Sequence, residues 1–135
     1  MITAYVPPGP TAPHACQVSY RHELAYGSSG VARNSMTYFQ YDKFGNVDHV
    51  REIGDPQDPT DDRLILRSYR PATGPCIVGL PWFEQRFAGA GPAAPLLRST
   101  YYCYDGDNGT ASVNCSGMPS KGLLTAVQAV DDTGH

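Results

Sequence analysis

Two of the four cysteines have the spacing of a loop-closing disulfide. Cys103 and Cys115 flank a polar, glycine-containing stretch that can bury little apolar area. A disulfide across a loop of this size would stabilise the fold by about 3 kcal/mol. An exported protein permits such a bond, but spacing does not establish connectivity, and two free thiols are the alternative. Cys16 and Cys76 are expected to be separate, and Cys76 precedes an apolar run, which favours a small buried hydrophobe over a nucleophile.

The remaining candidate ligands predict no metal site and no cofactor. His14, Cys16 and His22 do not have the two ligand pairs of a zinc pattern. Asp105 opens a segment that resembles a calcium loop, but an EF-hand requires glycine at position 6 and glutamate at position 12. Here glycine stands at position 5 and Ser116 at position 12. Four further acids favour a solvated acidic loop over a cation site; they are Asp55, Asp58, Asp61 and Asp62.

No arrangement of residues predicts catalysis, so we expect that the chain is not an enzyme. It has no G-x-S-x-G elbow, and Ser28 and Ser29 lie between glycines but not after a clear strand. Phosphate-binding glycine loops are absent as well. Asn108 and Asn114 begin formal N-glycosylation motifs, which matter only in an exported eukaryotic protein. We expect a bacterial origin, in which they would be silent.

A cluster of aromatic residues offers the one candidate ligand surface. Trp82 and Phe83, with Tyr101 and Tyr102, could stack against a sugar if their rings project outward. Packing inside the protein is the more ordinary fate of aromatic residues in strands. Glycan stacking is therefore the weaker of the two interpretations.

A repeated phrase determines which elements must position these residues. The pattern T-Y-x-x-Y-D occurs at 37–42 and again at 100–105, and each copy leads to a glycine and an apolar run. From Asp42 to Gly45 the gap is 3 positions, and from Asp105 to Gly122 it is 17. The second copy thus carries a 14-residue insertion at about 106–120. Internal repetition indicates a stack of strand–turn–strand units.

Each residue of the repeated phrase has a plausible structural role. Gly45 allows a positive φ, and Asn46 can adopt a left-handed conformation or bond to the local backbone. The Asp42 carboxylate can accept N–H groups of the turn, and Tyr41 supplies a large ring with one hydroxyl. We interpret these residues, and Tyr104, Asp105 and Gly122 in the second copy, as structural.

The rest of the chain predicts an all-β fold of stacked antiparallel hairpins. No 3.6-residue apolar period extends over ten residues, because proline and glycine interrupt every window. Residues 1–34 form a Pro/Gly-rich segment with a single strand, and 35–135 form the repeat region. The expected strands are 16–20, 35–42, 47–53, 63–69, 76–81, 82–87, 96–104 and 123–130.

Composition excludes several classes of protein. The 135 residues suit one domain, and 41% hydrophobic with 17% charged residues indicates a folded chain without a membrane span. A net charge of −3 and a pI near 5.7 argue against a nucleic-acid partner. The N-terminus has no charged region followed by an apolar stretch, so no signal peptide is visible.

The repeated phrase resembles the YD repeat of the Rhs family, which is built around Y-D-x-x-G-[R/N]-[L/V]. Tyr41 to Val47 fit every position. The second copy fits at Tyr104, Asp105 and Gly122, but Leu123 stands where Arg or Asn is usual. The segment between the copies resembles the Rhs-like region of insecticidal toxin complex B components.

This resemblance implies a β-ribbon that spirals into a hollow shell around a toxic C-terminal polypeptide. The chain is then expected to be a fragment of a larger exported bacterial protein, secreted or at the cell surface. Its partners would be neighbouring repeats and the enclosed toxin domain. A cell-surface module that binds carbohydrate or protein is the alternative.

Overall fold

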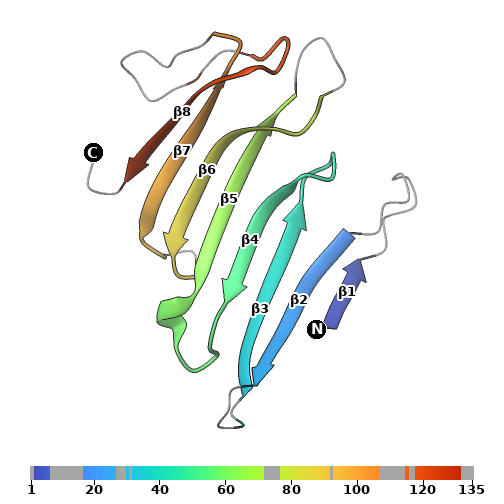
Figure 1. Ribbon diagram of the computed structural model, residues 1–135, viewed down its shortest axis with the longest axis vertical. Helices are drawn as coiled ribbons and strands as arrows, with labels where there is room; N and C mark the ends of the chain where they lie inside the picture. Colours follow the sequence, from blue (N-terminus) through green and yellow to red (C-terminus); the bar gives the residue numbers. More distant parts are fainter. Residues whose placement is uncertain are drawn as a thin grey trace.

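The computed structural model describes residues 2–6, 17–26, 30, 32–71, 77–91, 93–106, 115 and 118–131, and they form one antiparallel sheet (Figure 1). The predicted all-β class is confirmed, since the described part contains eight strands and a single 3-10 turn, Pro59–Asp61. The strands are β1 (Ile2–Val6), β2 (Gln17–Tyr26), β3 (Ala32–Tyr41), β4 (Val47–Ile53), β5 (Arg63–Arg70), β6 (Leu80–Ala88), β7 (Leu96–Tyr104) and β8 (Leu124–Asp131).

The sheet is a succession of hairpins, as predicted. Its strand order is β1-β2-β3-β4-β5-β6-β7-β8, so every strand pairs with its neighbours in the sequence. All seven pairings are antiparallel. β1 and β8 therefore form the two opposite edges of the sheet (Figure 1).

The predicted strand over 76–81 is wrong. Ile77, Val78 and Gly79 are exposed and lie outside any strand, and β6 begins at Leu80 and continues through Pro81. Proline is tolerated there because Pro81 lies opposite Tyr69 at an irregularity of the pairing, where a ladder N–H is not required. Cys76 lies outside the described residues.

The N-terminal segment contains more regular structure than the single strand predicted for residues 1–34. β1, β2 and the beginning of β3 all lie within it and belong to the same sheet as the repeat region. The strand at Ile2–Val6 is only five residues long and precedes a proline-rich stretch, which hid it in the sequence.

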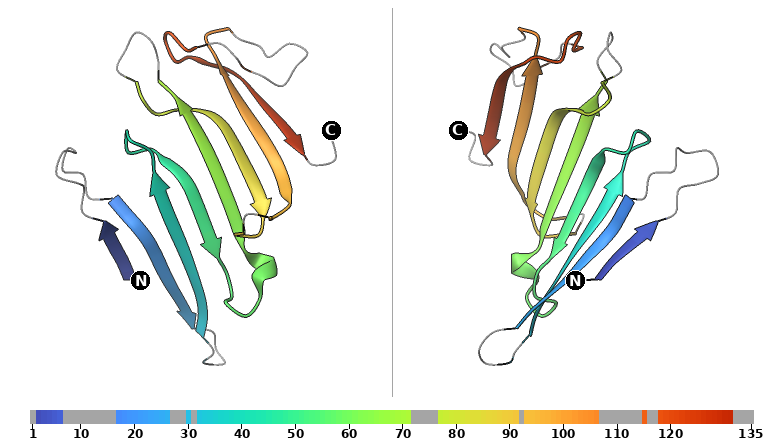
Figure 2. Two further views of the ribbon diagram at one scale, coloured as in Figure 1. Left: turned by 180° about the vertical axis from the view of Figure 1, so that it is seen from behind. Right: turned by 45° about the vertical axis from the view of Figure 1, so that its right-hand side comes forward.

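The described strands form a single layer, with no second sheet or helix of the described part over either face (Figure 2). Among the described residues, the buried apolar side chains are only Val50, Cys103, Cys115 and Pro119. The chain exposes 8966 Å², compared with about 6,900 Å² for a compact monomer of its mass. Next-neighbour pairing, rather than a deep core, holds this sheet together.

An ion-pair cluster around one buried carboxylate lies near the centre of the sheet. Glu84, which is 7% exposed, accepts hydrogen bonds from Arg67 and Arg86 at 2.8 Å each. Burial opposes ionisation of this carboxyl, but the two guanidinium groups outweigh it and lower the pKa of Glu84. Arg67 and Glu84 are cross-strand partners of β5 and β6.

Candidate functional site

The first Tyr-Asp turn joins β3 to β4 through a network centred on Asp42. Its backbone N–H donates to Asn46 at 2.9 Å, and its carbonyl accepts from Gly45 at 3.1 Å. The carboxylate accepts from the Phe44 N–H at 2.8 Å and from the N–H and side-chain amide of Asn46 at 2.9 Å each. Gly45 adopts a φ of 88°, which is the conformation that favours glycine.

Asn46 also joins this turn to a distant part of the chain. Its side-chain amide donates to the Val78 carbonyl at 2.8 Å, just before β6 begins. A Cβ added at Gly79 would approach the Asn46 side-chain oxygen to 2.9 Å, so this contact is close. The turn is therefore locked both by Asp42 and by the neighbouring connection.

Asp105 closes the second turn in the same way, although the insertion separates the two sides. Its N–H donates to the Leu123 carbonyl at 2.8 Å. Its carboxylate accepts backbone N–H groups of four consecutive residues, at 2.6 to 3.3 Å; they are Ser120, Lys121, Gly122 and Leu123. These bonds, with the one from Lys121 the strongest cause, hold the pKa of Asp105 well below its usual range.

The tyrosine of each phrase makes a bond that sequence reasoning did not foresee. Tyr41 donates its hydroxyl to the Val18 carbonyl at 2.8 Å, and Tyr104 donates to the Pro81 carbonyl at 2.7 Å. In both cases the acceptor lies at the start of the preceding strand. The hydroxyl thus ties together two strands at the end where their ladder has stopped.

Tyr69 is a third member of this set. Its hydroxyl donates to the Val47 carbonyl, at the start of the preceding strand, at 2.8 Å. This copy was missed in the sequence because residues 65–70 keep only the second tyrosine of T-Y-x-x-Y-D. The one available signal was a tyrosine near the end of a strand, at the position that Tyr41 and Tyr104 occupy in theirs.

A register shift marks the same position in four strands. We call β1, β3, β5 and β7 the odd strands and the others the even strands. Each odd strand shifts register against the next even strand directly before one tyrosine. The tyrosines and the residues opposite them are Tyr5–Val18, Tyr41–Val47, Tyr69–Pro81 and Tyr104–Leu124. The backbone unit is therefore one even strand plus one odd strand.

A disulfide anchors the insertion to the sheet. Cys103 on β7 is bonded to Cys115, with Cα atoms 4.9 Å apart. The Cys115 carbonyl accepts from the indole N–H of Trp82 at 2.9 Å and from Arg70 at 3.1 Å. The Arg70 guanidinium lies 3.9 Å from the centre of the Trp82 ring. Cys115 thus joins the insertion to β5, β6 and β7.

The aromatic residues proposed for glycan stacking make internal contacts. Trp82 is half-buried under Arg70 and uses its N–H on Cys115. Phe83 packs against Tyr101 with ring centres 4.7 Å apart. The indole N–H of Trp82 is thus used inside the protein, and each ring has one neighbour within the sheet.

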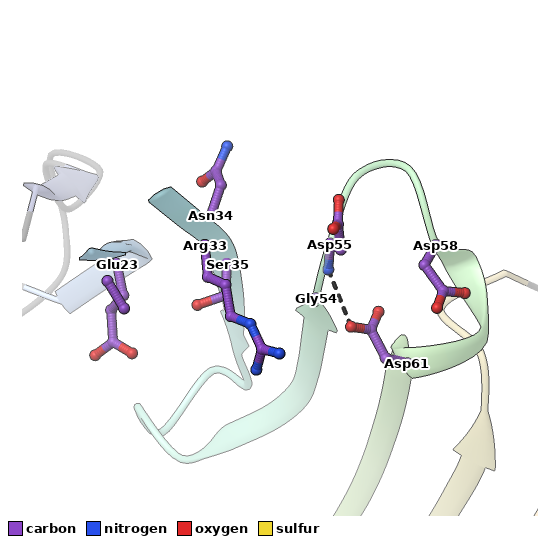
Figure 3. Close-up of a pocket in the computed structure, with 9 residues that line it drawn as sticks. Glu23, Arg33, Asn34, Ser35, Gly54, Asp55, Asp58 and Asp61 are labelled. Atoms are coloured by element: carbon purple, nitrogen blue, oxygen red, sulfur yellow. Dashed lines mark hydrogen bonds between the residues drawn. The ribbon is translucent and has the colours of Figure 1, made fainter. Parts of the chain in front are cut away.

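The acidic loop and its neighbours line a hollow of about 460 Å³ (Figure 3). Arg33 lies between Glu23 and the loop in this view. The acids bond to their own loop, since Asp61 accepts the Asp55 N–H at 3.1 Å and Asp58 accepts the Thr60 N–H at 3.0 Å. In the part of the chain that the structure describes, no group of three or more His, Cys, Asp or Glu residues could hold a metal ion.

Several residues singled out in the sequence lie outside the described residues: His14, Cys16, Ser28, Ser29, Asn108 and Asn114. His22 on β2 contacts the side-chain oxygen of Asn34 on the neighbouring strand. No helix in the described part is long and apolar enough to cross a membrane. Comparison with family models, curated proteins and solved structures finds no match to this chain.

Proposed function

We propose that the chain is a wall segment of an Rhs/YD-repeat shell that encloses the toxic C-terminal polypeptide of an exported bacterial protein. The observation that carries this proposal is the tyrosine bond made by three successive odd strands. Tyr41, Tyr69 and Tyr104 each donate to a carbonyl at the start of the preceding strand. Equivalent bonds in successive units are what one continuous ribbon requires.

The single-layer architecture supports a role as a wall. Every strand pairs only with its neighbours in the sequence, so further units could extend the sheet without rearranging it. Containment requires a closed surface and no catalytic group. Backbone pairing, tyrosine bonds and Asp-closed turns supply one continuous section of such a surface without a deep core.

The test is protease protection in the parent protein. The C-terminal region of the folded parent should survive a protease concentration that rapidly digests the same region expressed alone. The matched variant carries Asp42→Ala and Asp105→Ala, which should open two turns and increase cleavage. Rapid digestion of the C-terminal region in the folded, unmodified parent would refute containment.

Glycan binding by Trp82 and Phe83 stays a prediction without added support, because both rings make internal contacts. A glycan array with the chain and its Trp82→Ala variant measures it directly. Binding that disappears in this variant would move the function toward a surface-binding module.

A further inference from the structure

The carbonyls that accept the tyrosine hydroxyls form a series that runs one member beyond the observed bonds. Val18, Val47 and Pro81 each lie opposite the tyrosine of one odd strand and accept the hydroxyl of the next odd tyrosine. Leu124 lies opposite Tyr104 in the same relation. Its carbonyl is the fourth position of the series, and β8 is the last strand of the sheet.

The ladders between an even strand and the following odd strand all start in the same register, although the β6–β7 ladder shifts farther along, between Arg86 and Phe87. The first pair of the β2–β3 ladder is Tyr20 opposite Tyr38. Tyr20 lies two residues after the acceptor Val18, and Tyr38 lies three residues before the donor Tyr41. The same two offsets hold in the other two hairpins, whose first pairs are His49–Leu66 and Phe83–Tyr101.

β8 has the chemistry of a strand edge that accepts a partner. Its only charged residue is Asp131, at its end, where natural edge strands often carry lysine or proline to prevent pairing. Leu123, Leu124 and Val127 are 62%, 55% and 54% exposed. A neighbouring strand would cover part of this apolar surface and extend the ladder.

We propose that the β8 edge docks an extended, antiparallel segment of about ten residues that ends in a tyrosine, and that this tyrosine donates its hydroxyl to the Leu124 carbonyl. The partner is thus an odd-type strand of a neighbouring repeat, so the inference rests on the repeat-array part of the proposed function. By the same offsets, the residue three before the tyrosine of the docked segment forms the first pair of the ladder, and it lies opposite Ala126.

The β3 sequence of this chain is a ready probe for the edge. In a peptide of residues 32–42, the same offsets place Tyr41 at Leu124, Tyr38 opposite Ala126 and Arg33 opposite Asp131. Asp131 already pairs with Arg98 of β7 at 2.7 Å, so Arg33 would add a second guanidinium beside this carboxylate. We expect saturable binding to the 135-residue chain in fluorescence anisotropy, with hydrogen-exchange protection gained in the β8 amides.

Two peptides with single tyrosine-to-phenylalanine substitutions distinguish the tyrosine hydrogen bond from nonspecific binding. The Tyr41→Phe peptide loses the donor to Leu124 and should bind about five- to tenfold more weakly, the effect of one neutral hydrogen bond. The Tyr38→Phe peptide also loses one hydroxyl but not that donor, so its affinity should match that of the original peptide.

Three outcomes would overturn the inference: no binding at about millimolar peptide, protection gained on strands other than β8, or equal affinity of the Tyr41→Phe and original peptides. None of them bears on protease protection of the parent's C-terminal region. Failure of the docking edge is therefore distinguishable from failure of the shell.

Discussion

At the scale of single residues, the tyrosine hydroxyl does more than the sequence indicated. The ladder between β2 and β3 ends at Tyr20 opposite Tyr38, and the Tyr41 hydroxyl bridges to Val18 beyond that end. In a sheet with little buried apolar area, such a bond holds together strand ends that packing cannot. The ring was predictable as a packing element, but its partner depends on register, which the sequence does not show.

Replacing Tyr104 by Phe should therefore weaken the fold with little change in shape. The variant keeps the ring and loses the bond to Pro81, so the free energy of unfolding in urea should fall by about 1 kcal/mol. Tyr26→Phe is the matched control, since its ring is 72% exposed and it should leave stability nearly unchanged. Equal stability of the Tyr104→Phe variant and the unmodified chain would mean that the hydroxyl bond contributes nothing.

Asp105 gives the fold a specific dependence on pH. Backbone N–H groups lower its pKa when the chain folds, relative to about 3.9 in an unfolded chain. Its stabilising contribution is therefore complete above about pH 4 and is lost as pH falls toward the lower folded-state pKa. The Asp105→Asn variant should melt at a lower temperature than the unmodified chain at pH 7. This difference in melting temperature should shrink below pH 4.

Thermal melts of both proteins from pH 7 to pH 2 measure this difference. Glu52→Gln, at an exposed position of β4, controls for the loss of one negative charge. A melting difference for Asp105→Asn that is constant over the whole range would contradict the role assigned to the carboxylate.

At the scale of elements, hairpins were predictable because both turn and strand signals were local. Gly45 and Asn46 after a β-rich run were sufficient to place β3 and β4. The third unit was missed because Tyr69 shares only its hydroxyl bond and register shift with the other copies, and both are tertiary features. The prediction that a strand ends at Pro81 was wrong for the same reason. A proline inside a strand is acceptable only at an irregularity of the pairing, which the sequence does not reveal.

The disulfide should hold the insertion against the sheet. Cys103→Ser with Cys115→Ser is expected to reduce the free energy of unfolding by about 3 kcal/mol. The Cys115 carbonyl also accepts the indole N–H of Trp82, the chain's only tryptophan. Release of that contact should shift tryptophan emission to longer wavelength.

Urea unfolding and emission spectra of the folded double variant measure the two effects separately. The double variant Cys16→Ser, Cys76→Ser is the control. It should keep the emission maximum of the unmodified chain, and a reductant should shift that maximum as it does in the unmodified chain. An unchanged emission maximum in the Cys103–Cys115 variant would show that the carbonyl contact does not depend on the disulfide.

At the scale of the whole molecule, the sequence predicted the all-β hairpin stack but not its thinness. Alternating apolar residues usually indicate one buried face, whereas here both faces of the sheet carry exposed large hydrophobics. Tyr38 and Val127, for example, are 40% and 54% exposed. In the proposed shell, neighbouring units or cargo would cover those faces, and no property of this chain's composition encodes them.

A sheet of this kind should be least stable at its edges. Each strand pairs only with its sequence neighbours, so the inner strands have two pairing partners and β1 and β8 have one each among the described strands. In such a linear array, stability is approximately the sum of local units and their interfaces.

Amide hydrogen exchange should therefore be slowest in β4, β5 and β6, around the Arg67–Glu84 pair, and progressively faster toward β1 and β8. Because β7 is held to the insertion by the disulfide, adding a reductant should increase exchange in β7 and β8 and leave β2 and β3 unchanged. Uniform protection across all strands would instead indicate that the sheet unfolds as one cooperative unit, which next-neighbour pairing alone does not explain.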